Sequence, residues 1–283
     1  MFRILALLPF PVLRALFGFV AICVRVGGWR RKVIDQHLAR CLADMPLAGR
    51  DRIAGGFYGY LGELVAEVVH AERITGERLA ERVVFDNPEA VQSVLHGGQR
   101  VMILAAHHCN WEWLLLRCSV AFGVPLVAAY KPPGLKSGDR ALQRMRCRFG
   151  ATLVPAKQIV QYLLEKRGKV RLLALVADQS PAASNDQQVW LSFFGQQTAF
   201  FRGPGWIATR MGYTVFLAAM RREREGHYAV RLVELKSEAG GSRRDPDDIL
   251  RAYATVLEAH VRQHPMEYFW AYRRWKRSKR LYE

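Results

Sequence analysis

Short, continuous apolar segments that alternate with helix-like segments limit most strongly how this chain can fold. Three of these segments are Val101–Ala106, Val124–Tyr130 and Arg171–Asp178. They are almost entirely apolar instead of alternating between apolar and polar residues, which is typical of strands covered on both faces. Because helix-like segments separate them, we predict an α/β fold with a mainly parallel central sheet and helices on both faces.

Helices and shorter strands are expected on either side of these three strands. The expected helices are Val33–Met45, Arg52–Val69, Trp111–Phe122, Asp139–Phe149, Gln158–Arg167, Gly205–Met211 and Pro246–His264, and the shorter strands are Thr152–Val154, Thr214–Met220 and Tyr228–Leu235. The segment Ser180–Gln188 is predicted to be a polar loop, and an aromatic turn is expected over residues 190–194. The length of 283 residues fits one domain over residues 29–283, preceded by an N-terminal membrane-associated helix in residues 1–28.

The N-terminal 28 residues are apolar apart from three arginines, Arg3, Arg14 and Arg25. Because these arginines are 11 residues apart, about three helical turns, an unbroken helix would align them in one stripe. A signal peptide is disfavoured because Arg14 interrupts the apolar run, and the same arginine would be costly near the middle of a membrane span. We therefore favour an amphipathic helix at the bilayer surface, with Pro11–Val26 as its best part. A core helix of a soluble domain remains the alternative.

Basic residues outnumber acidic ones, with 42 Lys and Arg against 25 Asp and Glu, and the formal charge is +17. The excess is concentrated in residues 1–50, 131–171 and 262–283. One basic run is often only a solvated surface, but three such runs on a nearly neutral remainder indicate an anionic partner. Nucleic acid, a membrane surface and a phosphorylated substrate all satisfy this description. Because 51% of the residues are hydrophobic, the chain can bury a core, which excludes a disordered protein.

The strongest chemical signal lies where a buried strand ends and a helix begins, with His107 in the turn and Glu112 at the start of the helix. Ligands of open α/β sheets bind at the carboxyl ends of strands, so this is a plausible catalytic position. Asn110 is a candidate N-cap of the helix. The Glu112 carboxylate is expected to fix the imidazole tautomer while His107 takes a proton from a hydroxyl group.

Two neighbouring residues offer alternatives to this arrangement. His108 is a second candidate base, although its spacing from Glu112 is less suitable. Cys109 is a candidate nucleophile of a thioester hydrolase, but a small buried residue is the commoner role for such a cysteine. No Gly-x-Ser-x-Gly turn is present, which favours direct transfer from a bound donor over a serine acyl-enzyme.

The segment His107–Glu112 resembles the His-x4-Asp/Glu motif of the glycerolipid acyltransferase superfamily, and it is most similar to the late acyltransferases of lipid A biosynthesis, the lauroyl/myristoyl-transferase family. Further segments match that family in order: Tyr130-Lys131-Pro132, Arg144–Gly150, Asp178-Gln179, Phe193-Phe194-Gly195, Gly203-Pro204 and His264–Lys276. Four features depart from the family pattern. Arg202 replaces a threonine, Tyr272 stands where a histidine is frequent, Cys109 is unusual at the third position of its motif, and Ser180–Gln188 lacks a glycine-rich form.

The resemblance implies that a fatty acyl group passes from acyl carrier protein to a hydroxyl of a lipid A precursor or related glycolipid. It implies catalysis by His107 and Glu112, with no cofactor. No metal is required by this chemistry or indicated by the spacing of the residues. The residues implied in substrate binding are Lys131, Arg146, Arg148, Asp178, Gln179, Arg273 and Arg274. Among the arginines that could stabilise an oxyanion or bind phosphate, Arg148 is preferred because it directly precedes Phe149 and Gly150, as in the family pattern. Arg273 and Arg274 could instead hold the C-terminal segment on the body.

The resemblance also implies a place and partners for the protein. It places the chain at the cytoplasmic face of a bacterial inner membrane, where acyl carrier protein, the lipid acceptor and an anionic membrane surface are the expected partners. Nucleic acid is not expected. The alternatives are an acyltransferase for another lipid or a pigment acceptor, and a basic protein that binds membrane or nucleic acid without catalysis.

Overall fold

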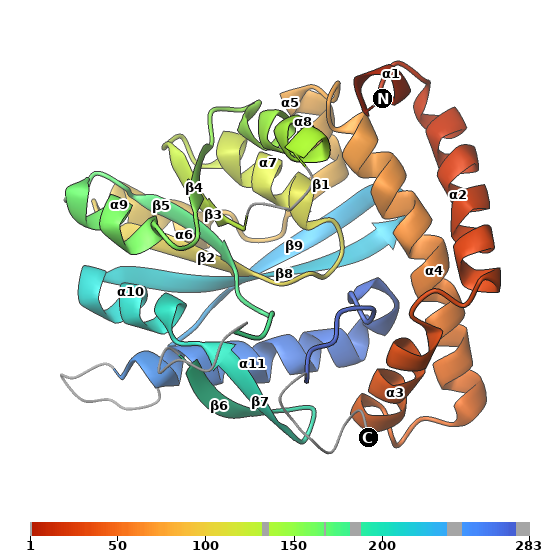
Figure 1. The fold of residues 1–283 in the computed structure, drawn as a ribbon. Helices are drawn as coiled ribbons and strands as arrows, with labels where there is room; N and C mark the ends of the chain where they lie inside the picture. Colours follow the sequence, from red (N-terminus) through yellow and green to blue (C-terminus); the bar gives the residue numbers. More distant parts are fainter. Residues whose placement is uncertain (1, 132–135, 167, 182–187, 237–244, 276–283) are drawn as a thin grey trace.

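A mixed sheet forms the centre of the structure, a computed structural model that describes residues 2–131, 136–166, 168–181, 188–236 and 245–275 (Figure 1). Within these ranges the sheet has seven strands in the order β1-β9-β8-β2-β5-β3-β4. The strands are β1 (Val83–Phe85), β2 (Arg100–Ala105), β3 (Leu126–Tyr130), β4 (Thr152–Pro155), β5 (Leu172–Val176), β8 (Tyr213–Arg224) and β9 (His227–Glu234). All neighbouring pairs are parallel except the antiparallel pair β8–β9, so the prediction of a mainly parallel sheet is confirmed.

Strand β2 shows why the sheet is covered on both faces. Its residues alternate between two hydrophobic clusters, with Met102 and Leu104 in one and Val101 and Ile103 in the other. The second cluster is closed by α5 (Gly76–Arg82), α6 (Glu89–His96), α7 (Trp111–Ala121) and α8 (Lys136–Cys147). The first is closed by α9 (Ile159–Glu165), α10 (Gly203–Met211) and α11 (Pro246–Gln263). Figure 1 shows the two layers, with α7 and α8 above the sheet and α10 and α11 below it.

Helices α1 (Phe2–Leu5), α2 (Phe10–Val26), α3 (Arg31–Cys41) and α4 (Leu47–His70) precede the sheet, and α2 runs alongside α4 (Figure 1). Gly62 of α4 permits this close approach, because a Cβ atom there would lie 2.6 Å from the carbonyl oxygen of Phe17. The opposite side of α2 exposes large apolar side chains: Val12, Leu16, Phe19, Val20, Ile22 and Val26.

None of the helices in the described ranges is, by itself, long and apolar enough to cross a bilayer, whereas α2 and α3 taken together meet that test across an 83° bend.

The segment expected to be an aromatic turn is a β-hairpin of β6 (Gln188–Phe193) and β7 (Gln196–Phe201). Its two loop residues, Phe194 and Gly195, have φ angles of 53° and 67°, which suit the right-handed twist of the flanking strands. Strand β1 and helices α5 and α6 were not expected. Residues 182–187 of the predicted polar loop and residues 276–283 of the basic region 262–283 lie outside the described residues.

Candidate active site

A five-residue loop, residues 106–110, joins the end of β2 to the start of α7, as the sequence predicts. Asn110 caps α7, because its Oδ1 atom accepts a hydrogen bond of 2.9 Å from the backbone N–H of Trp113. The loop is also bonded to the segment after α11. The backbone N–H of Phe269 donates to the carbonyl of His107 at 2.9 Å, and that of Cys109 donates to the carbonyl of Glu267 at 3.1 Å. Bonds at both ends therefore fix the position of His107.

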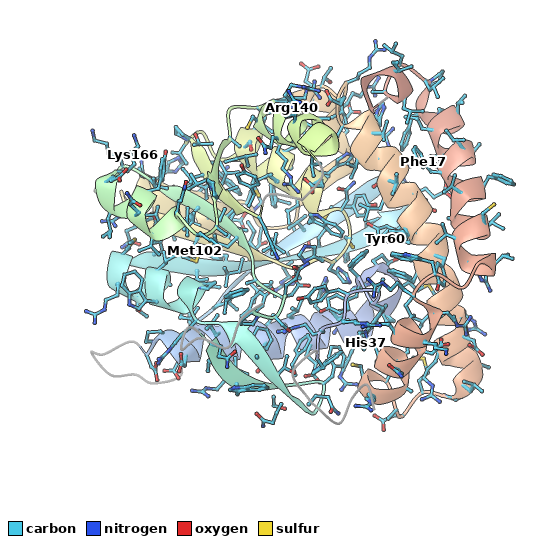
Figure 2. The ribbon with its side chains drawn as sticks, viewed as in Figure 1. Phe17, His37, Tyr60, Met102, Arg140 and Lys166 are labelled. Atoms are coloured by element: carbon cyan, nitrogen blue, oxygen red, sulfur yellow. The ribbon has the colours of Figure 1, made fainter. Side chains whose placement is uncertain are left out.

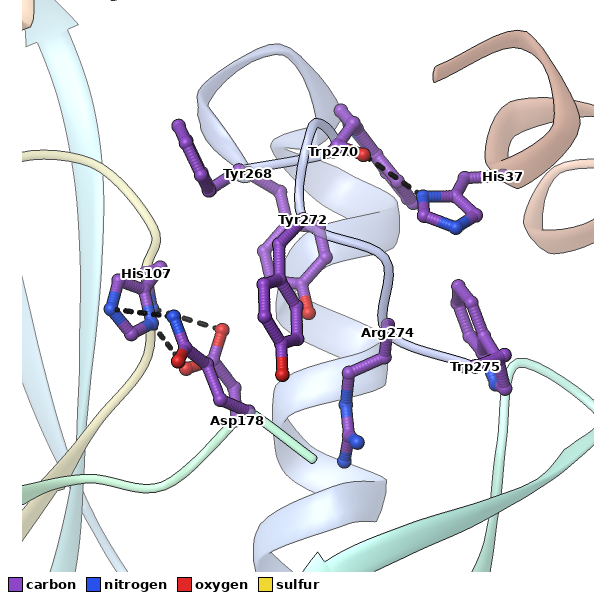
Figure 3. A pocket seen from close by; sticks show the side chains of 10 residues that line it. His37, His107, Asp178, Tyr268, Trp270, Tyr272, Arg274 and Trp275 are labelled. Carbon is purple, nitrogen blue, oxygen red and sulfur yellow. Dashed lines mark hydrogen bonds and ion pairs between the residues drawn. The ribbon is translucent and has the colours of Figure 1, made fainter. Parts of the chain in front are cut away.

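His107 is paired with Asp178, which lies two residues beyond the end of the neighbouring strand β5 (Figure 3). Its Nδ1 atom is 2.7 Å from Asp178 Oδ1, and its backbone N–H donates to Oδ2 at 3.1 Å. Because a carboxylate only accepts hydrogen bonds, Nδ1 carries the proton of the neutral ring. The Nε2 atom, 3.2 Å from Gln179 Nε2, is then the basic nitrogen and accepts from the amide.

The electrostatic surroundings of this pair favour its charged form. Burial lowers the pKa of His107, but the adjacent Asp178 carboxylate and its hydrogen bond outweigh burial, so the pKa lies above the usual value. Burial raises the pKa of Asp178, and the His107 ring outweighs that effect in turn, so this pKa lies below its usual range. Asp178 is therefore placed to orient the imidazole and to stabilise an imidazolium.

Glu112 has a different partner from the one expected. Arg146 of α8 donates to it through two nitrogen atoms, with Nε 2.7 Å from Oε2 and Nη2 2.5 Å from Oε1. The indole Nε1–H of Trp111 also donates to Oε1 at 3.1 Å. The first turn of α7 thus directs Glu112 toward α8, although its negative charge still raises the pKa of His107.

A pocket of about 260 Å³, part of which is open solvent, adjoins the His107–Asp178 pair. Its lining residues are His37, His107, Asp178, Gln179, Tyr268, Phe269, Trp270, Tyr272, Arg274 and Trp275. His37 reaches this wall from α3 (Figures 2 and 3), and its Nδ1 atom is 2.9 Å from the carbonyl oxygen of Trp270. The aromatic run 268–275 was noticed in the sequence, but no spacing pointed to His37.

The family model for bacterial lipid A biosynthesis acyltransferases matches residues 1–277. The chain belongs to this family. No curated protein matches the chain. The family match covers the whole sheet and both of the residues expected to be catalytic, so the pocket beside His107 belongs to an acyltransferase that acts in lipid A biosynthesis.

The two candidate arginines of this acyltransferase lie in different surroundings. Arg146, in the last turn of α8, meets Glu112 as described above. Arg148, the preferred arginine, lies beyond the end of α8, donates to the carbonyl of Ala71 and lies over the ring of Phe149 at 5.3 Å. The structure therefore places Arg146, and not Arg148, next to the expected catalytic carboxylate.

The remaining cationic residues of the acyltransferase are spread over two regions. Lys131, just after β3, is exposed, and so is Arg273. Arg274 is buried, and its Nη1 atom donates to Ser180 Oγ at 2.5 Å and to the carbonyl of Ala199 at 2.7 Å. Its guanidinium also lies 4.3 Å from the centre of the Phe200 ring. These contacts tie the C-terminal segment to the body at Arg274, which also lines the pocket.

The other candidate base and the candidate nucleophile of the acyltransferase do not line the pocket. Burial raises the pKa of the Cys109 thiol well above its usual value, and its Sγ donates to the carbonyl of Met220 at 3.2 Å. Burial lowers the pKa of His108 to about 3, and its Nε2 atom is 2.8 Å from the carbonyl of His264. A thiol with a raised pKa is a poor nucleophile, so these surroundings favour a structural role for Cys109.

Proposed function

We propose that this acyltransferase moves a fatty acyl chain from the thioester of acyl carrier protein to a hydroxyl of a lipid A precursor or a related glycolipid. The observation that carries the proposal is the His107–Asp178 pair at the edge of a pocket with aromatic walls. The family match supports the acyl transfer and the lipid class. The choice of acyl carrier protein as donor rests on the sequence resemblance, and the His–carboxylate mechanism rests on the geometry of the site.

In the proposed reaction His107 is the general base. Its Nε2 atom takes the proton of the acceptor hydroxyl, whose oxygen replaces the Gln179 amide at that nitrogen and attacks the thioester carbonyl carbon. A new C–O bond forms and the carbonyl oxygen becomes an oxyanion. When the intermediate collapses, the C–S bond breaks and the imidazolium returns its proton to the leaving thiolate. Asp178 holds the Nδ1 proton throughout and stabilises the imidazolium.

Glu112 and Arg146 form the second proposed part of the site. Asp178 already occupies the Nδ1 atom of His107, so Glu112 acts on the ring through its charge alone. That charge raises the pKa of His107 and would stabilise the imidazolium. Arg146 fixes Glu112 by a two-point contact, which is geometrically specific. Lys131 and Arg273, as exposed cations, are proposed to meet substrate phosphates, and Arg148 is kept as a further candidate for this contact.

Helix α2 is proposed to lie in the interface of the bacterial inner membrane, with the body of the protein on the cytoplasmic side. The exposed apolar side of α2 supports this position. Two exposed cations that follow it, Arg30 and Lys32, suit anionic headgroups. The pocket would then lie within reach of a lipid acceptor.

The function is tested with purified protein, acyl carrier proteins of defined chain length and a membrane lipid extract, with mass spectrometry of the products. We expect an acylated lipid with the wild type, and its loss with His107→Ala and with Glu112→Ala at unchanged far-UV circular dichroism. Full transfer by both variants would overturn the mechanism. Transfer from another thioester donor alone would overturn the role of acyl carrier protein, and acylation of a pigment or another lipid would replace the acceptor.

A further inference from the structure

A buried carboxylate outside the pocket is bonded to the loop that carries His107. Glu67 of α4 is 1% exposed. Its Oε2 atom accepts hydrogen bonds of 2.7 Å from Asn110 Nδ2 and of 2.7 Å from the Tyr228 hydroxyl. Its backbone carbonyl accepts from the indole Nε1–H of Trp113 at 3.0 Å. One residue of α4 therefore binds both the loop and the first turn of α7.

Asn110 is the point at which this network reaches the loop. It is fully buried, and its side chain uses both ends: Oδ1 caps α7 and Nδ2 donates to Glu67. The preceding residue, Cys109, has a φ of 51°, a conformation that costs free energy for a residue with a side chain. Such a backbone conformation persists only where neighbouring contacts enforce it, and the bonds around Asn110 are contacts of that kind.

We propose that Glu67 is a positioning residue for the acyl transfer, acting through Asn110 to hold the loop between β2 and α7. The loop places His107 against Asp178 at one end and, through the first turn of α7, Glu112 against Arg146 at the other. This inference rests on the proposed function for its effect on catalysis. It does not require that Glu67 touch either substrate.

An acceptor oxygen suits this position, because Oε2 receives two hydrogen bonds, one from the loop and one from β9. The hydroxyl of Tyr228 is also bonded to the hydroxyl of Tyr60, at 3.2 Å. The Glu67 side chain is therefore the point at which α4, β9 and the N-cap of α7 meet. Tyr60 lies on the sheet side of α4 in Figure 2. The neighbouring face of α4, at Gly62, carries α2. Glu67 thus joins the helix pair α2–α4 to the catalytic loop.

The first test compares Glu67→Met, which removes the acceptor, with Glu67→Gln, which keeps an amide oxygen. Glu63→Met is the matched control, since Glu63 lies one turn earlier on α4 and binds Arg222 instead of Asn110. In the full-length protein we expect Glu67→Met to lower kcat about 10- to 100-fold, because small displacements of catalytic groups have effects of that size. We expect its KM for the acyl donor to change little, and Glu67→Gln to recover most of the rate. Equal kcat values for Glu67→Met and Glu63→Met would overturn the proposal.

A second test does not require the removal of a buried group. Asn110→Asp keeps an oxygen for the α7 cap but turns a second carboxylate toward Glu67, so we expect a lower kcat. Adding Glu67→Gln supplies an amide N–H that can donate to the new carboxylate, so the double variant should regain activity that Asn110→Asp lost. A double variant no more active than Asn110→Asp would overturn the link through Asn110.

A third measurement separates this inference from the proposed function. Amide hydrogen exchange of residues 106–113 reports the loop directly, whether or not transfer is observed. We expect faster exchange there in Glu67→Met than in the wild type and in Glu63→Met. If the wild type transfers no acyl group, the proposed function fails while this comparison still decides whether Glu67 holds the loop. Unchanged exchange in Glu67→Met would overturn the positioning role.

Discussion

The Nδ1 atom of His107 lies 2.7 Å from Oδ1 of Asp178, a residue 71 positions later in the chain. The register of the sheet explains this contact, because β2 and β5 are parallel and Ala105 is paired with Val176. Each member of the pair therefore lies two residues beyond a matched position at the carboxyl edge of the sheet. Ligands of open α/β sheets bind at this edge, which is also where the pocket lies.

Replacing the orienting carboxylate is expected to change both the rate and its pH dependence. In Asp178→Asn a neutral amide replaces the carboxylate that raises the pKa of His107. Burial then dominates, and the pKa of His107 falls. Since His107 acts as a base only when neutral, the acid limb of kcat/KM should move to lower pH. The maximal rate should fall about 10³- to 10⁴-fold, as when a triad aspartate is replaced. A pH–rate profile with an unmoved acid limb would contradict the pairing.

The two arginines near the end of α8 should behave differently. Arg146→Ala leaves the Glu112 carboxylate buried without its cation, and breaking a buried pair of this kind costs about 3–5 kcal/mol. We therefore expect a lower free energy of unfolding in urea and a loss of transfer. Arg148→Ala, which removes a bond to a backbone carbonyl and one candidate phosphate contact, should lose less transfer than Arg146→Ala. Larger losses of transfer in Arg148→Ala than in Arg146→Ala would reverse the assignment.

Glu67 should make the stability of the protein depend on pH. Burial raises the pKa of Glu67 to about 7, above the value of a carboxyl in the unfolded chain. The folded state therefore binds more protons, and the contribution of Glu67 to stability is complete at acidic pH and declines as the pH rises to about 7. The decline amounts to as much as about 3 kcal/mol. Urea unfolding at pH 4.5 and pH 8 should show a smaller fall for Glu67→Gln than for the wild type, and equal falls would contradict the shift.

The exposed side of α2 should bind lipid. Ile22 is 61% exposed, and Leu164, on α9, is 59% exposed and serves as a control of similar exposure. Ile22→Ser is expected to weaken sedimentation with anionic phospholipid vesicles about tenfold, because burying an aliphatic side chain stabilises by about 1.5–3 kcal/mol. Leu164→Ser should bind as the wild type does. The same loss in both variants would show that α2 is not the contact.

Local signals in the sequence predicted much of the site. The strand β2, the loop with His107 and the Asn110 cap are encoded within a dozen neighbouring residues, and all were expected. The partner of His107 was not, since Glu112 was expected in that role and Asp178 in substrate binding. Only the register of two distant strands brings Asp178 to Nδ1.

The other differences also arise from tertiary contacts. The preference for Arg148 followed a residue pattern, which carries no information on where α8 ends. The hairpin β6–β7 was not expected because its turn, Phe194-Gly195, lacks the Asn-Gly or Asp-Gly pair that usually signals a hairpin. His37 reaches the pocket by packing of α3 against the C-terminal segment, which no local pattern describes.

The bonds between the catalytic loop and residues 267–269 have a consequence for the order of synthesis. The last strand of the sheet, β9, ends at Glu234, so every strand leaves the ribosome before Glu267 and Phe269 do. During that interval the nascent chain can pair its strands, but the loop that carries His107 lacks the backbone partners that hold it. Emergence of the final helix and the segment after it therefore completes the catalytic loop, so the assembly of the active site is a late event in the folding of the growing chain.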